Sequence, residues 1–110
     1  MIGYINLKRS IHLLFLSIAY SDSTSALVYS LLAHGARALG NNEQGQEFID
    51  KAEHASKNYL GTISYETASL YHLIGHYHFG SGNLPSAYLY LHLSKTILDA
   101  FIKYDENLIN

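Results

Sequence analysis

Residues 67–90 read TASLYHLIGHYHFGSGNLPSAYLY, which is the pattern of a helix, a turn and a second helix. The turn is Gly80-Ser81-Gly82-Asn83, and glycine and asparagine tolerate the left-handed conformation that ends helices. Pro85 then suits the first turn of the following helix, because its fixed φ is helical. Small residues at Gly75 and Ala87 would let the two helices cross closely. The stretch therefore predicts an antiparallel helical hairpin.

Apolar residues recur at helical spacing in the part of the chain that precedes this hairpin. Residues 43–60 carry one apolar stripe at steps of three and four, which consists of Phe48, Ile49, Ala52, Ala55 and Tyr59. A segment rich in small residues runs before it to about Leu39, after the possible N-cap residues of 22–24. Within that segment Ala33, Gly35 and Ala36 would let another helix approach closely.

Helix boundaries follow from the caps and breakers. Ser64 is expected to cap a helix that ends near Phe79, and Gly61 separates this helix from the one before it. The last helix is expected to end at about Tyr104, with a fraying tail from Asp105, and the first covers about 4–20. The fold class is all-α, with about five antiparallel helices in stacked helical hairpins and local packing like that of a tetratricopeptide repeat. The chain forms a single domain over 1–110 or a fragment of a larger helical regulatory domain.

Residues 1–24 allow a second interpretation. Lys8-Arg9 precede an apolar run over 11–20, and small polar residues follow, which is also the order of a secretory signal peptide. We prefer a buried helix, because His12 and Ser17 interrupt the run. The run is also shorter than the roughly 20 residues of a membrane span, so no membrane association is expected.

Composition excludes several classes of function. The 110 residues include seven Lys and Arg against nine Asp and Glu, which gives a formal charge of −2. Nucleic-acid affinity comes mainly from clustered Lys and Arg, so direct nucleic-acid binding by this segment is not expected. The absence of cysteine rules out disulfides, thiolate zinc sites and a cysteine nucleophile in this sequence.

The hairpin has a local likeness to a tetratricopeptide repeat. Gly82 lies seven positions after Gly75, and Ala87 lies twelve after it. His78 and Ser94, however, stand where that repeat prefers Tyr and Ala, and no second copy follows at a period of about 34 residues. Because the likeness is only local, a tetratricopeptide-like scaffold that binds a protein or peptide partner is kept as the alternative function.

A longer resemblance covers about residues 25–98. The chain resembles the middle, regulatory region of fungal-type zinc-cluster transcription factors, whose helical domain follows a six-cysteine DNA-binding module. The order of parts agrees: a small-residue helix, Phe-x-x-x-Ala, a Leu-rich helix, Gly-Ser-Gly-Asn and Ala-Tyr-x-Tyr. Here these parts are residues 33–36, 48–52, 67–75, 80–83 and 87–90.

The resemblance also has departures. The family continues with Gly, Ala and an Ile-Arg-Met-Ala series, where this chain has His92, Ser94 and Lys95-Thr96-Ile97-Leu98. The family domain is far longer than 110 residues, and the zinc cluster is absent because this sequence has no cysteine. The resemblance implies a diverged or truncated regulatory module that acts in transcription regulation in the nucleus, with the cytoplasm as the alternative location.

The resemblance further implies what the module contacts. Its partner would be another protein or the remainder of its own regulatory domain. Zinc and DNA binding would belong to an upstream cysteine cluster outside this sequence, so no cofactor is expected in this chain. The residues expected to position the hairpins or to contact partners are Phe48, Ala52, Leu73, Gly75, Gly80, Gly82, Ala87, Tyr88 and Tyr90.

The sequence holds seven histidines, and two of them have ligand spacing. His72 and His76 lie four apart, so both imidazoles could face one metal ion, and His92 could approach from the paired helix. We prefer half-buried, hydrogen-bonded histidines at helix contacts, because two ligands rarely suffice. The cluster could also act as a pH switch, since imidazole titrates near neutral pH.

No enzyme signature is present in the sequence. Asp50 and Glu53 lie on a polar helix face and are interpreted as surface residues, and Ser64 is interpreted as a helix cap. Gly80-Ser81-Gly82 joins two helices and is not followed by Gly-Lys-Ser/Thr, so it is not a phosphate-binding loop. The ten tyrosines are interpreted as amphipathic packing or as part of a protein interface.

Overall fold

The computed structural model describes residues 23–109, and it describes side chains for residues 25–104. These residues form four α-helices and one short 3₁₀-helix, with no strand among them, which confirms the all-α class. The number of helices is four in this part of the chain, not about five. The elements are α2 (Ser23–Ala38), α3 (Asn42–Ser56), η1 (Lys57–Tyr59), α4 (Tyr65–Gly80) and α5 (Leu84–Ile109). The helix expected over 4–20, and the alternative signal peptide, lie outside the described residues.

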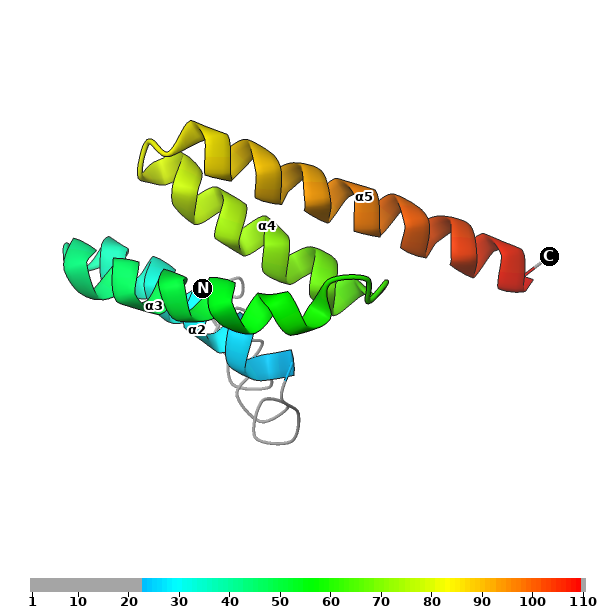
Figure 1. Cartoon of the computed structure of the whole chain (residues 1–110), viewed down its shortest axis with the longest axis horizontal. Coiled ribbons are helices and arrows are strands. Elements are labelled where there is room, and N and C mark those ends of the chain that lie inside the picture. The colour runs from blue at the N-terminus through cyan, green and yellow to red at the C-terminus, as the bar shows by residue number, and fades with distance from the viewer. Residues whose placement is uncertain (1–22, 110) are drawn as a thin grey trace, which may run out of the picture.

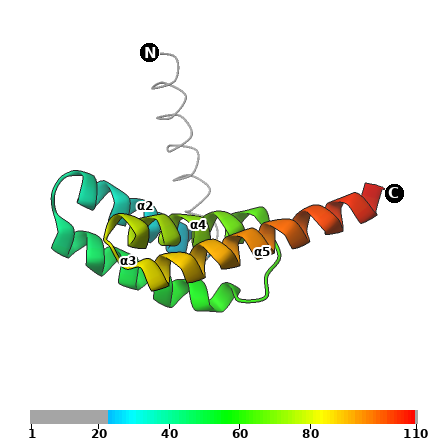
Figure 2. The ribbon, with the colours of Figure 1, turned by 90° about the horizontal axis from the view of Figure 1, so that it is seen from above.

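The helices pair as two antiparallel hairpins, α2 with α3 and α4 with α5 (Figure 1). Helix α4 also contacts both α2 and α3, and α5 packs mainly on α4. Figure 2 shows the same arrangement from above, with the far end of α5 extending away from the other helices. Helix α4 is thus the central element, and most of its circumference is buried, as expected of a helix with few charged residues.

The helix boundaries agree with the expected caps to within a few residues. Ser64 caps α4, since its Oγ accepts a hydrogen bond from the Thr67 backbone N–H at 3.1 Å. Asn41 caps α3 in the same way through Gln44, although its sequence position indicated only the end of the preceding helix. Gly82 has φ of +82°, so the turn between α4 and α5 uses the left-handed conformation expected of glycine.

Two expectations about helix length and packing are wrong. Helix α5 continues to Ile109, past the end expected at Tyr104, because no breaker follows that tyrosine. Gly35 was expected to permit a close helix approach, yet it is exposed and a Cβ placed on it would meet no atom within 4 Å. The other two residues expected there, Ala33 and Ala36, are buried, as are Ala26 and Ser30 of the same helix.

The core lies between the two hairpins. Its two largest fully buried side chains are Tyr71 and Tyr77 of α4. The stripe predicted on α3 is present, because Ile49 and Ala52 are fully buried while Phe48, Ala55 and Tyr59 pack against the core. The other buried members of the cluster are Ala26, Ala33, Leu70 and Ile74. Among the described residues, no helix combines the length and the apolar character needed to cross a membrane.

Candidate functional site

Four polar contacts join the first hairpin to α4, and the fourth is a hydrogen bond from Tyr71. His34 Nε2 donates to the Leu73 carbonyl oxygen at 2.8 Å, and Arg37 Nη1 donates to the Tyr77 carbonyl oxygen at 2.6 Å. The third contact is an ion pair between the His78 imidazole and the Glu53 carboxylate. Helix α4 is therefore held by α2 through His34 and Arg37 and by α3 through Glu53 and the Ser56 carbonyl. These contacts fix the relative position of the hairpins.

The ion pair belongs to a cluster of aromatic side chains. The His78 ring is stacked on Tyr90, with centroids 5.8 Å apart, and Tyr90 is stacked on Tyr71 at 5.9 Å. The Tyr71 hydroxyl donates to the Ser56 carbonyl oxygen at 3.1 Å. Burial, together with the nearby Glu53 charge and Tyr71, raises the pKa of Tyr90 to about 12. Burial also raises the pKa of Tyr71 above its ordinary value.

This cluster corrects one expectation about Glu53. The side chain was expected on a solvated face, but it pairs with His78, whose side chain is only 7% exposed. The surface position expected for Glu53 was wrong because its partner, His78, lies 25 positions away in another helix. His78 itself is a hydrogen-bonded histidine at a helix contact, which is the interpretation preferred from the sequence.

The two candidate metal ligands, His72 and His76, are adjacent on the exposed side of α4. Their ring centroids lie 4.4 Å apart. Desolvation, and then the proximity of His76, lowers the pKa of His72. Among the described side chains no group of three His, Asp or Glu residues gathers around a possible metal position, so the pair stands without a third ligand there.

Close contact between α4 and α5 occurs at Gly75. A Cβ placed on Gly75 would lie 2.7 Å from Leu91 Cγ and 3.1 Å from the Leu91 backbone nitrogen. Ala87 is 2% exposed on the same hairpin, and the Ser94 hydroxyl donates to the Ala68 carbonyl oxygen at 2.6 Å. Gly75 thus lies at the close helix crossing expected from the sequence, and Ala87 is buried.

The remaining predicted site residues divide between buried and exposed positions. Phe48 is half-buried and stacks on Tyr29, whereas Ala52 is fully buried. Tyr88 is 77% exposed and lies parallel to the His92 ring. Tyr90, two positions later, faces the core cluster instead. Only Tyr88 of these residues presents its ring to solvent, and its contact with a partner stays a prediction.

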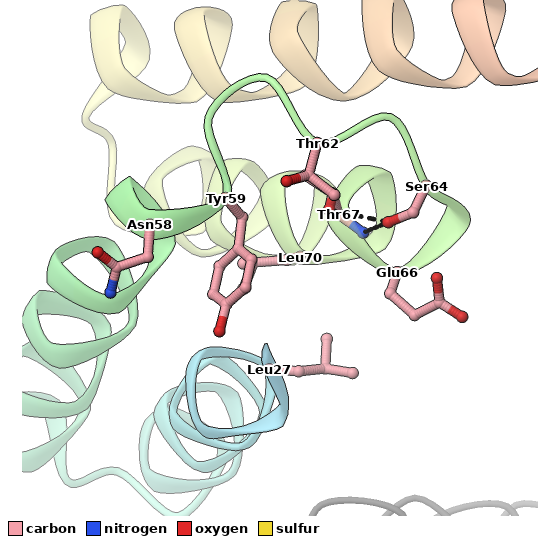
Figure 3. A pocket seen from close by; sticks show the side chains of 8 residues that line it. All are labelled: Leu27, Asn58, Tyr59, Thr62, Ser64, Glu66, Thr67 and Leu70. Atoms are coloured by element: carbon pink, nitrogen blue, oxygen red, sulfur yellow. Dashed lines mark hydrogen bonds between the residues drawn. The ribbon is translucent and has the colours of Figure 1, made fainter. Parts of the chain in front are cut away.

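A first pocket lies where α2 begins, α3 ends and α4 begins. We call it the Tyr59 pocket, and its volume is about 350 Å³. Figure 3 shows the Tyr59 ring reaching from η1 toward α2, where Leu27 faces the same hollow. The other lining residues are Asn58, Thr62, Ser64, Glu66, Thr67 and Leu70. The lining combines apolar side chains with hydroxyls and carries no paired acid and base.

A second pocket lies at the opposite end of the hairpins, where α2 ends, α3 begins and α4 ends. We call it the Arg37 pocket, and its volume is about 370 Å³. It is lined by Arg37, Asn42, Gln46, Tyr77, Gly80 and Ser81. A Cβ placed on Gly80 would lie 2.4 Å from Arg37 Nη1, so the absence of a side chain at Gly80 provides the space for the guanidinium. Sequence reasoning did not identify Arg37, because a single arginine near a helix end has no motif.

The second half of α5 forms a third feature. Ser94 contacts the first turn of α4, so the residues of α5 beyond about Leu98 extend past the start of α4 (Figures 1 and 2). Ile102 is 47% exposed and Tyr104 is 63% exposed on this extension. Leu98 and Phe101 are half-buried. An apolar helix surface is thus left without a facing helix among the described residues.

Comparison of the chain with protein-family models, with curated proteins and with solved structures gives no match.

Proposed function

We propose that this chain is a regulatory, protein-interaction module that binds an amphipathic helix of a partner protein along the second half of α5. The observation that carries the proposal is the apolar surface of Leu98, Phe101, Ile102 and Tyr104 beyond the start of α4. The stacked hairpins hold α5 in place, and the extension presents the binding surface.

The energetics of an isolated helix support this proposal. A helical segment of about ten residues is marginal in water, because nucleation is costly and few hydrogen bonds repay it. Its stability comes mainly from packing an apolar stripe against another element. A partner helix laid beside residues 98–104 would bury Ile102 and Tyr104, and tyrosine is favoured at such partly wet interfaces.

The proposed role in transcription regulation comes from the sequence resemblance of residues 25–98. The likeness of residues 25–98 to the middle region of zinc-cluster transcription factors supports a role in transcription regulation and a nuclear location. This part of the proposal rests on the sequence pattern. The module would act by protein contact, with zinc and DNA binding supplied by sequence outside this chain.

A reporter assay tests both parts of the proposal. The full chain is fused to a heterologous DNA-binding domain, and transcription from a reporter gene is compared with that domain alone. We expect the fusion to change the output several-fold and the variant Ile102→Asp to abolish the change. The matched control is Leu39→Asp, which introduces the same charge at an 88% exposed leucine at the end of α2.

Two results would contradict the proposal. One is a reporter output equal to that of the DNA-binding domain alone. The other is an equal effect of Ile102→Asp and Leu39→Asp at matched protein level and helix content, since the α5 extension would then have no special role.

The second candidate function is a tetratricopeptide-like scaffold that binds a protein or peptide partner. The approach of Gly75 to Leu91, with Gly82 in the turn and Ala87 buried, supports it. Such a scaffold would bind its peptide in the α4–α5 groove lined by Tyr65, Leu73 and Leu98. Loss of partner binding on Leu73→Asp, with Ile102→Asp unaffected, would favour this candidate.

A further inference from the structure

We infer that the Arg37 pocket binds a carboxylate group. The inference is independent of the proposed function, because the pocket lies at the opposite end of the hairpins from the α5 extension. It rests on the free edge of the Arg37 guanidinium and on the polar side chains that line the same hollow, among them Tyr77.

The guanidinium of Arg37 is held in one orientation. Its Nη1 donates to the Tyr77 carbonyl oxygen at 2.6 Å and lies 3.4 Å from Ser81 Oγ. Its Cζ lies 4.7 Å from the centroid of the Tyr77 ring, in a cation–π contact. These hydrogen bonds occupy Nη1 alone, so the N–H groups of Nη2 and Nε have no protein acceptor among the described residues. A fixed guanidinium with free N–H groups matches the planar, two-oxygen edge of a carboxylate.

The Tyr77 side chain is a second polar group of the pocket lining. Tyr77 is only 2% exposed, and its hydroxyl forms no hydrogen bond with any described residue. The hydroxyl lies against α3, 2.8 Å from the position that a Cβ on Gly45 would take. Asn42 and Gln46 of α3 line the same pocket as Tyr77, and the Gln46 amide donates to Asp50. Among the described residues no fully buried side-chain oxygen or nitrogen lacks a hydrogen-bond partner. The Tyr77 hydroxyl is therefore still reached by water, and a carboxylate oxygen would replace that water as its acceptor.

The surrounding charges favour a single negative charge. No carboxylate lines the pocket, and Arg37 is its one cation within the described residues. Asp50 accepts a hydrogen bond from Gln46 at 2.9 Å, and the exposed Glu43 and Glu47 lie on the same helix. These acids would oppose a doubly charged phosphate more than a singly charged carboxylate. A volume of about 370 Å³ suits a small acid or the C-terminal residue of a peptide.

Nuclear magnetic resonance titration of the full chain tests the inference. The probes are acetate, its neutral isostere acetamide, and N-acetyl-alanyl-alanine with a free C-terminus. We expect acetate to produce saturable shifts of the Arg37 Nε–H and of the Asn42 and Gln46 side-chain amides, and acetamide to produce none. Tighter binding of the peptide than of acetate would identify a peptide C-terminus as the source of the carboxylate, and equal binding would identify a small acid.

Two variants separate binding from folding. Arg37→Gln is expected to weaken acetate binding by about tenfold or more, because charge-assisted hydrogen bonds are lost. Since Arg37 also joins α2 to α4, the second variant is Asn42→Asp, which places a competing carboxylate beside Arg37 at an exposed position in the first turn of α3. It is expected to abolish acetate binding while the helix content is unchanged.

The matched control is Asn58→Asp, which makes the same charge change at the Tyr59 pocket, away from Arg37. It is expected to leave acetate binding unchanged. Absence of saturable shifts with acetate, equal shifts with acetamide, or equal loss of binding in Asn42→Asp and Asn58→Asp would overturn the inference.

Discussion

The His78 imidazole on α4 pairs with the Glu53 carboxylate on α3, so one largely buried ion pair connects the two hairpins. His78 is also stacked on Tyr90 of α5. A single side chain of the central helix therefore contacts the helices on both sides of it. Removal of either side chain would leave the other without this partner, and the His78 side chain is only 7% exposed there.

The first prediction concerns this ion pair. Glu53→Gln is expected to lower the free energy of unfolding by about 1–3 kcal/mol, the usual size for a hydrogen bond to a charged group. Urea denaturation monitored by circular dichroism measures the change. The matched control is Glu47→Gln, the same substitution at an exposed position of α3, which is expected to change stability by less than about 0.5 kcal/mol. Equal effects of the two variants would show that the pair contributes nothing to the stability of the fold.

The second prediction uses two helical glycines in different surroundings. Gly75→Ala places a Cβ 2.7 Å from Leu91 Cγ and is expected to destabilise the fold by about 1–3 kcal/mol through overpacking. Gly35→Ala meets no atom within 4 Å and is expected to stabilise the fold by about 0.5–1 kcal/mol, because alanine favours helix. Thermal denaturation of both variants checks the opposite signs. A rise in melting temperature for Gly75→Ala would contradict the close crossing of α4 and α5.

The third prediction concerns alkaline pH. The folded-state pKa of Tyr90 is raised from 10.0 to about 12, so folding stabilises the neutral phenol. The corresponding stability is present below about pH 10 and is lost as the pH rises toward 12. We expect Tyr90→Phe to make the free energy of unfolding less dependent on pH between 9 and about 11.5 in a urea-denaturation series. Tyr88→Phe, which alters an exposed phenol, is the control, and an identical pH profile for the two variants would refute this account.

The fourth prediction concerns mildly acidic pH. The pKa of His72 is lowered by desolvation and by His76, so folding favours the neutral imidazole. Its contribution to stability is present above the unfolded pKa and is lost as the pH falls through the lower folded value. We expect the melting temperature to decrease below about pH 6.5, and His76→Gln to reduce that decrease by removing the like charge. His54→Gln, at an exposed histidine of α3, is the control. A melting temperature that is flat between about pH 5.5 and 8 would exclude a pH response from this pair.

The helices and their ends could be predicted because their determinants are local. Ser64, Gly82 and the stripe from Phe48 to Tyr59 act within a few residues, so their effects follow from spacing alone. Gly75 and Ala87 indicated the close helix crossing for the same reason. The end of α5 was misplaced because the sequence after Tyr104 holds neither a glycine nor a proline to mark it.

The polar contacts between the hairpins could not be predicted in the same way. Glu53 and His78 are 25 positions apart, and Arg37 and Tyr77 are 40 apart. No periodicity within one helix relates such residues, because their proximity depends on how the hairpins dock. The Arg37 pocket is accordingly a property of the assembled fold, formed where the ends of three helices meet.

The pairing of neighbouring helices also determines how the chain should fold. Because α2 packs on α3 and α4 packs on α5, most contacts within each hairpin join residues that are close along the chain. Such a low contact order is typical of chains that fold within microseconds to milliseconds. We expect each hairpin to form before the two associate, which would place the Glu53–His78 and Arg37–Tyr77 contacts in the later association step. We therefore expect Glu53→Gln to accelerate unfolding while it leaves the folding rate nearly unchanged.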